Sequence, residues 1–232
     1  MAERAFGCGR PAGDAVHDTP VLLVHGYGHN RSGWFDLERQ LRRAGFTSVH
    51  TMNYTAYGRD GVPALAARLA ARVDELRALT GASKVHIVGH SLGGVLARWY
   101  VQELGGDEFV DTAVTVASPH EGTLAAFAGV GPCARDLRPG SRVVRRLAAG
   151  ARPSPVRWVT FSSEADVVVR PAVSGMLRTK ALAATNVTVC GEGHVGIMSS
   201  PAVLAGVAAA LSHVPAAGAE AEAEAAAEAE AA

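Results

Sequence analysis

Ser91 is the residue of this chain best placed for chemistry, because it lies in the segment Gly-His-Ser-Leu-Gly-Gly at residues 89–94. An apolar run at residues 84–88 precedes this segment, and a helical pattern follows it at residues 95–104. A serine between glycines at a strand-to-helix turn is how hydrolytic enzymes expose a hydroxyl for nucleophilic attack. Glycines are needed there because the turn has unusual backbone angles and little room for side chains. The pattern predicts a serine nucleophile, and the alternative is a glycine-rich turn with a solvent-facing serine.

A serine hydroxyl needs a base within hydrogen-bond distance, and histidine is the usual one. When the order along the chain is serine, acid, histidine, His194 and His213 are the candidates. His194 lies in the glycine-rich segment 191–196, directly after an expected strand. His213 lies at the end of an expected helix, where interaction with the helix dipole explains it. We therefore predict His194 as the base.

The acid should follow the fifth expected strand, because that position is next to the His194 segment. Asp166 and Glu164 both qualify. Three valines follow Asp166, and they would bury its surroundings and strengthen its interaction with the imidazole. We favour Asp166 and keep Glu164 as the alternative; for each, an exposed loop carboxylate is the simpler explanation to exclude.

A negatively charged reaction intermediate needs backbone N–H donors. The first expected strand ends in a His-Gly-Tyr-Gly segment, so the N–H of Tyr27 can pair with that of Leu92. Three further histidines lie near these positions. We expect His25 to brace the loop and His90 to pack in the turn, whereas His120 could line the pocket mouth or be structural.

Elements that could position these residues alternate along the chain. Near-continuous apolar runs, typical of strands buried on both faces, predict six strands at residues 20–25, 48–54, 84–89, 110–117, 156–162 and 186–190. Amphipathic helices lie between them. The clearest, at residues 63–80, has a leucine and valine stripe: Leu65, Leu69, Val73, Leu76 and Leu79. Another helix ends near Gly45, and the last has Ser200 and Pro201 at its N-cap and N1 positions. This alternation predicts a doubly wound α/β fold with mainly parallel strands.

The domain organisation follows from the same reading. We expect an irregular segment at residues 1–18, one α/β domain at 19–214 and a disordered, low-complexity Ala/Glu tail at 215–232. Residues 118–155 are too long for an ordinary connection and would leave the sheet at the edge where ligands bind. We interpret them as a short cap over the site, with a surface excursion as the alternative.

Composition limits the function classes. The chain has 232 residues, 48% of them hydrophobic, with 22 basic and 22 acidic side chains. The cations are scattered rather than clustered with aromatics, which argues against nucleic acid as a partner, and no apolar run is long enough to span a bilayer. The first residues lack the apolar stretch of a secretory signal, so the sequence as it stands fits a cytoplasmic protein or a mature or truncated form of an exported one. We expect a monomer.

Cysteine and histidine spacing predicts no metal site and no cofactor. The three cysteines, Cys8, Cys133 and Cys190, are far apart. Buried free thiols are the simplest explanation, and a Cys133–Cys190 disulfide is the alternative for an exported protein.

Four segments carry a family resemblance: residues 24–28, 88–94, 162–169 and 191–197. Through them, residues 19–211 resemble the small bacterial triacylglycerol lipases of the α/β-hydrolase superfamily, especially the minimal, nearly lidless lipases of bacilli. The resemblance implies an α/β-hydrolase fold with Ser91, Asp166 and His194 as catalytic residues. It also implies the N–H groups of Tyr27 and Leu92 as the oxyanion hole.

The expected activity is hydrolysis of carboxylic esters of lipid or other acyl type, through an acyl-enzyme on Ser91. The same residues could act on thioester, amide or phospholipid acyl bonds, because fold and triad do not determine the substrate. A non-catalytic binding module of the same fold is the other alternative.

Overall fold

The computed structural model describes residues 16–212. The expectations for residues 1–15, for Cys8, for His213 and for the Ala/Glu tail lie outside the described residues. Within this range the fold is built on one sheet of six strands, all parallel, in the order β2-β1-β3-β4-β5-β6. The strands are β1 (Val21–Val24), β2 (Val49–Met52), β3 (Val85–His90), β4 (Val110–Val116), β5 (Arg157–Ser163) and β6 (Thr185–Val189). The expected α/β class with six strands is confirmed.

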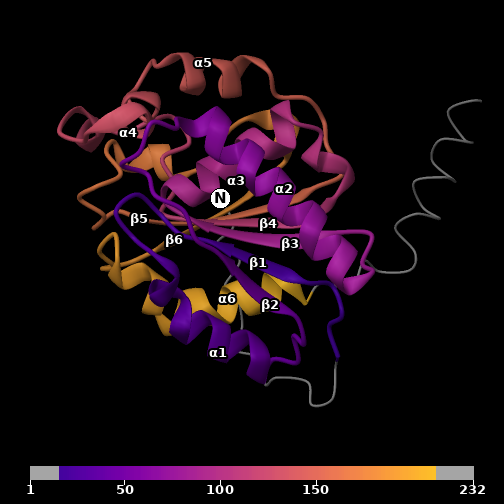
Figure 1. Cartoon of the computed structure of the whole chain (residues 1–232). Helices are drawn as coiled ribbons and strands as arrows, with labels where there is room; N and C mark the ends of the chain where they lie inside the picture. The colour runs from indigo at the N-terminus through magenta and orange to yellow at the C-terminus, as the bar shows by residue number, and fades with distance from the viewer. Residues whose placement is uncertain (1–15, 213–232) are drawn as a thin grey trace, which may run out of the picture.

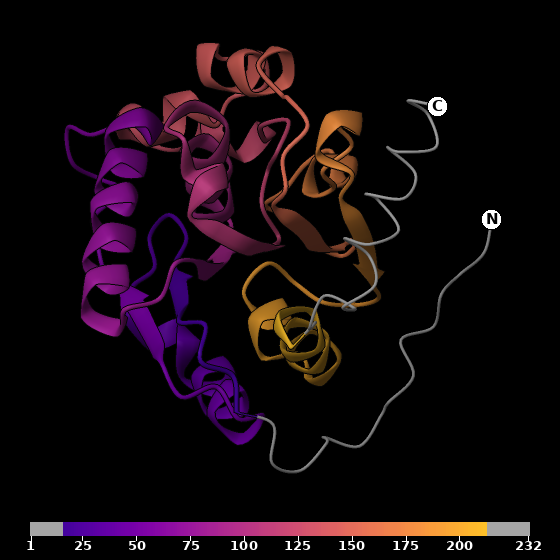
Figure 2. The same ribbon diagram turned by 90° about the vertical axis from the view of Figure 1, so that its right-hand side faces the viewer.

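Helices cover both faces of this sheet (Figure 1). The α-helices are α1 (Phe35–Arg43), α2 (Val62–Thr80), α3 (Leu92–Glu103), α4 (Gly131–Asp136), α5 (Arg142–Ala149) and α6 (Pro201–Leu211). Among the described residues, six short 3₁₀ segments lie in the connections between helices and strands: η1 (Arg31–Trp34), η2 (Gly106–Glu108), η3 (Leu124–Phe127), η4 (Ala172–Gly175), η5 (Lys180–Leu182) and η6 (Gly196–Ser199). Figure 1 shows α2 and α3 on one face and α1 and α6 on the other, and the perpendicular view keeps α2 and α6 apart (Figure 2).

The central strands are buried because each face of the sheet has its own hydrophobic core. Along β1, Leu22 and Val24 belong to the core under α2 and α3, while Val21 and Leu23 belong to the core under α1 and α6. Alternating side chains of one strand therefore face two cores. The edge strand β6 is mostly exposed or half-buried, so it departs from this pattern.

The N-cap position of Ser200 is confirmed, and one detail of the helix predictions is wrong. Leu79 was placed on the buried stripe of α2, but its side chain is 72% exposed. Successive residues of a helix are about 100° apart when viewed down its axis. In this view the buried residues of α2 form an arc that begins at Leu65, and Leu79 lies about 40° outside it. Ser200 does occupy the N-cap of α6, yet its side chain makes no capping hydrogen bond.

Residues 118–155 connect β4 to β5 and contain η3, α4 and α5. We call this segment the insertion. Its α4 is attached to the start of α2, since Asp136 Oδ2 accepts a hydrogen bond from the Val62 N–H at 2.8 Å. Whether the insertion acts as a cap stays a prediction. Among the helices between residues 16 and 212, none combines the length and apolar character needed to cross a bilayer.

Candidate active site

Ser91 lies between β3 and α3, at the carboxyl edge of the sheet, and its backbone is strained. Its φ of 52° and ψ of −120° belong to a sparsely populated region, which costs about 1–3 kcal/mol. The flanking glycines permit this turn: a Cβ on Gly93 would lie 2.1 Å from the Val24 carbonyl oxygen, and one on Gly89 would lie 2.5 Å from the Gly94 nitrogen. The Ser91 N–H donates to the Val116 carbonyl at 2.9 Å, which fixes the turn to β4.

His194 lies in the loop between β6 and η6, and its ring reaches the serine. Nε2 of His194 is 3.0 Å from Ser91 Oγ, and Nδ1 is 2.7 Å from Asp166 Oδ2. Because an ionised carboxylate can only accept, Nδ1–H donates to Asp166. In the neutral ring, Nε2 is then the acceptor for the Ser91 hydroxyl, which is the arrangement a general base needs.

Asp166 follows β5 and is almost fully buried, at 2% exposed. Burial alone would raise its pKa, but hydrogen bonds from His194 and from the N–H groups of Val169 and Val168 outweigh burial and lower the pKa. The two N–H groups donate to Oδ1 at 2.9 and 2.7 Å. Of the three valines after Asp166, Val169 is buried as expected, Val168 is half-buried and Val167 is 74% exposed. Val168 and Val169 also act through their backbone donors, which was not expected.

The competing acid Glu164 and the histidines His25 and His120 are separate from this hydrogen-bonded line. Glu164 is exposed. His25 Nδ1–H donates to the Gly26 carbonyl at 2.9 Å, and its ring stacks on Tyr54 at 4.2 Å between centroids, so it braces the loop as expected. His120 is buried, with Nε2 3.0 Å from Thr115 Oγ1, and thus has structural contacts.

The backbone N–H groups of Tyr27 and Leu92 have no acceptor among residues 16–212. For Leu92 the reason is its place at the first position of α3, since the first N–H groups of a helix have no partner within it. The loop of Tyr27 approaches the turn of Ser91 closely, because a Cβ on Gly26 would lie 2.8 Å from Ser91 Cβ. Two donors are thus available beside the serine.

An apolar pocket of about 90 Å³ opens beside Ser91. Its walls come from four parts of the chain: Tyr27, Ser91, several residues of the insertion, and Val168 with Val169. The insertion residues are small or apolar: Pro119, Thr123, Ala125, Ala126, Gly129, Ala134 and Leu137. The insertion, predicted from its length alone, thus forms much of the pocket wall.

Several residues next to the pocket residues in sequence have large, exposed apolar side chains. Each of the following is adjacent in sequence to a pocket residue and is at least half exposed: Leu124 (59%), Phe127 (59%), Val130 (64%) and Val167 (74%). Val195, beside His194, is 52% exposed. Apolar residues gathered at the edge of a pocket are typical of a site that meets an apolar partner.

Arg98 is a structural residue that sequence reasoning missed. It lies on α3, is 2% exposed, and donates to the carbonyls of His120 and Leu147 at 3.0 and 2.9 Å. It also bonds Thr179 Oγ1 at 2.9 Å and Gln102 Oε1 at 2.7 Å. Burial lowers its pKa to about 10. A single arginine in an amphipathic helix pattern gives no signal of such a role.

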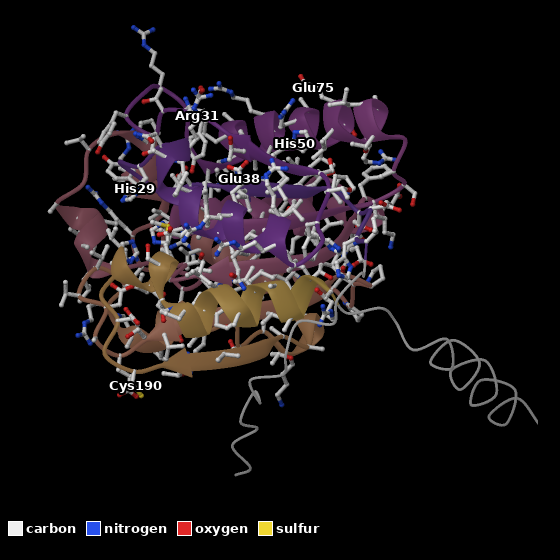
Figure 3. The ribbon with its side chains drawn as sticks, turned by 90° about the horizontal axis from the view of Figure 1, so that it is seen from below. His29, Arg31, Glu38, His50, Glu75 and Cys190 are labelled. Atoms are coloured by element: carbon white, nitrogen blue, oxygen red, sulfur yellow. The ribbon has the colours of Figure 1, made fainter. Side chains whose placement is uncertain are left out.

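The cysteines that the structure describes are both free. Cys133 is buried, as expected, but Cys190 is exposed, and Figure 3 shows it at the outer margin beside β6, far from the labelled His29, Arg31 and Glu38. The alternative of a Cys133–Cys190 disulfide is therefore wrong for this structure. Within residues 16–212, no three His, Cys, Asp or Glu side chains are grouped to hold a metal ion.

Comparison with known proteins identifies the architecture. The family described as alpha/beta hydrolase fold matches residues 19–133. This protein has the α/β-hydrolase fold. Aspergillus fumigatus lipase B has a similar structure, with a TM-score of 0.74 at 21% identity over 84% of this chain and 52% of the lipase. The mature Bacillus licheniformis lipase BlEst2 gives a TM-score of 0.66 at 19% identity over 81% of this chain and 91% of that chain.

In sequence, this α/β hydrolase is 32% identical over 111 residues to a triacylglycerol lipase of Pseudarthrobacter phenanthrenivorans. The match covers 45% of this chain and 34% of that lipase, so it spans about a third of the relative's length. The expected resemblance to bacterial lipases is confirmed. The solved structures support the fold alone, and the roles of individual residues in this α/β hydrolase stay predictions.

Proposed function

We propose that this α/β hydrolase is a serine carboxylic-ester hydrolase of the lipase and esterase type. The observation that carries the proposal is the hydrogen-bonded line from Ser91 Oγ through the His194 ring to Asp166, which ends beside an apolar pocket. Along this line Ser91 can act as the nucleophile and His194 as the base. The Asp166 carboxylate orients the base, which is the arrangement that ester cleavage requires.

In the proposed reaction, Ser91 Oγ attacks the ester carbonyl while His194 Nε2 takes its proton. The N–H groups of Tyr27 and Leu92 donate to the oxyanion that forms. The imidazolium returns the proton to the leaving alcohol, and the acyl group stays on Ser91. A water molecule, deprotonated by the same ring, then releases the carboxylic acid and restores the serine. Asp166 keeps the Nδ1–H tautomer in place and stabilises the imidazolium.

The pocket suggests the acyl group. Its volume of about 90 Å³ is small and its lining is apolar, which suits a short acyl chain. The exposed apolar residues around it favour an ester that is presented from an apolar phase, so we extend the proposal to short-chain acylglycerols.

A fluorophosphonate probe and a panel of p-nitrophenyl esters from C2 to C16 test this proposal. We expect covalent labelling of Ser91, fastest turnover at C4, and a loss of at least about 10³-fold in Ser91→Ala. Ser212→Ala, which removes a hydroxyl at the end of α6, serves as the control and should match the wild type. Absent labelling and absent turnover would favour the non-catalytic binding module, and faster turnover of thioester or amide analogues would favour those substrates.

A further inference from the structure

The loop that carries His194 is weakly held by packing. It spans residues 190–196 between β6 and η6. A Cβ added to Gly191 or to Gly193 would have no neighbouring heavy atom within 4 Å. At these two positions nothing packs closely against the loop, so hydrogen bonds must determine where His194 lies.

Within residues 16–212, every long-range hydrogen bond of this loop involves His194. Two of these bonds come from the ring, to Ser91 and Asp166. The third is a backbone bond, in which the His194 carbonyl accepts from His90 Nε2–H at 2.9 Å. The bond to Ser91 breaks when the serine proton moves, whereas the bond from His90 is independent of that transfer.

His90 itself is rigidly placed. It is the last residue of β3, it precedes Ser91, and it is 1% exposed. Its ring lies 4.8 Å from the His194 ring between centroids. The end of one central strand therefore carries both the serine and the donor that holds the backbone of the histidine.

Burial of the His90 imidazole costs free energy of folding, so its presence at this position needs an explanation. Its Nδ1 is buried without a partner among the described residues, and such a group costs about 1–3 kcal/mol. An apolar side chain of similar size would avoid this cost. Burial lowers the pKa of His90 to about 3, so the ring is neutral and has one N–H, the one that reaches His194.

We propose that His90 is a positioning residue, whose Nε2–H holds the His194 loop at the distance from Ser91 that proton transfer requires. The inference rests on the proposed function. It differs from the sequence-based expectation, which gave His90 only a packing role in the turn.

The test compares His90→Met, which keeps apolar volume without the donor, with His90→Gln, whose side-chain amide can donate from a similar position. A misplacement of about 1 Å can cost about 10²-fold in rate, so we expect kcat for p-nitrophenyl butyrate to fall about 10- to 100-fold in His90→Met, with KM within about twofold. His90→Gln should recover most of kcat. His86→Met is the matched control, since it removes another buried histidine of β3 away from the site.

Hydrogen–deuterium exchange of a peptide covering residues 190–198 gives a readout that does not depend on activity. We expect faster exchange in His90→Met than in the wild type and in His86→Met, with similar thermal midpoints. Wild-type exchange in His90→Met, equal kcat losses in both methionine variants, or no recovery in His90→Gln would each overturn the inference. A wild-type protein that neither labels nor turns over would instead refute the proposed function, and the exchange result would still decide the role of His90.

Discussion

The phenol of Tyr27 joins two loops that are 103 residues apart in sequence: its Oη donates to the Val130 carbonyl at 2.7 Å and accepts from the Val130 N–H at 3.1 Å. Tyr27 also lines the pocket and carries one of the two proposed oxyanion donors. Val130 lies between Gly129, a pocket residue, and Gly131, which has a φ of 84°. The side chain of Tyr27 therefore holds a glycine-flanked part of the pocket wall beside the oxyanion donors.

Tyr27→Phe should change chain-length selectivity, because it keeps the backbone N–H and removes both bonds to Val130. We expect kcat/KM for a C8 ester, relative to C4, to rise about 10-fold as residues 129–131 move outward, which corresponds to about 1.4 kcal/mol. The ester panel measures this ratio. Tyr57→Phe is the control, because the ring of Tyr57 packs edge-on against Tyr27. An equal change at every chain length would indicate that the phenol positions the oxyanion donors instead.

Asp166→Asn and Glu164→Gln separate the two acids that the sequence left open. Asparagine cannot accept the Nδ1–H as a carboxylate does, so His194 loses its tautomer preference, and we expect kcat to fall about 10³-fold or more. Glu164 is exposed, and its variant should stay within about twofold of the wild type. Both are measured as kcat for p-nitrophenyl butyrate, and a larger loss in Glu164→Gln would contradict the assignment.

Stability should fall steeply below pH 6.5, because three buried histidines are neutral in the folded state. Burial lowers the pKa of His86 to about 4 and of His90 to about 3, and it lowers the pKa of His120 well below 6.5. Between about pH 4 and 6.5 the unfolded chain binds these protons and the folded chain does not. The free energy of unfolding therefore rises with pH in this window, by up to about 4 kcal/mol per pH unit.

Urea denaturation at several pH values, followed by tryptophan fluorescence, measures this slope. His86→Met should lower it by about one proton, or about 1.4 kcal/mol per pH unit. A slope of zero between pH 4.5 and 6 would show that these rings titrate normally in the folded protein.

Arg98→Met should destabilise the fold without touching the pocket. It would leave the buried carbonyl of His120 without its donor, and the Leu147 carbonyl would keep only the Gln102 side-chain N–H at 3.1 Å. An unsatisfied buried group costs about 1–3 kcal/mol. We expect a loss of about 3 kcal/mol in the free energy of unfolding by urea. Arg68→Met is the control, since the only ion pair of Arg68 within residues 16–212 is an exposed one with Asp60 at 3.5 Å. Its change should stay within about 0.5 kcal/mol. Equal losses in the free energy of unfolding of the two variants would show that the buried hydrogen bonds of Arg98 contribute no more than the exposed ion pair of Arg68.

The strands and the line of Ser91, Asp166 and His194 could be predicted because each depends on local sequence. Continuous apolar runs determine buried strands, and the carboxyl ends of parallel strands meet at one edge, so residues after β3, β5 and β6 lie together. The sequence carries no comparable signal for contacts between segments that are distant along the chain. Nothing in the sequence near Tyr27 indicates Val130, and nothing near His90 indicates the carbonyl of His194.

The bonds of Arg98 limit how far the insertion can move. Its guanidinium holds the carbonyls of His120 and Leu147, which lie near the two ends of the insertion, and it does so from α3, the helix that begins next to Ser91. If the insertion moved away as one body, the buried guanidinium would lose these two carbonyl acceptors and keep only Thr179 Oγ1 and Gln102 Oε1, which is unfavourable for a buried charge. Any widening of the pocket entrance for a larger ester would then come from local movement near residues 124–131, while the ends of the insertion stay attached to α3.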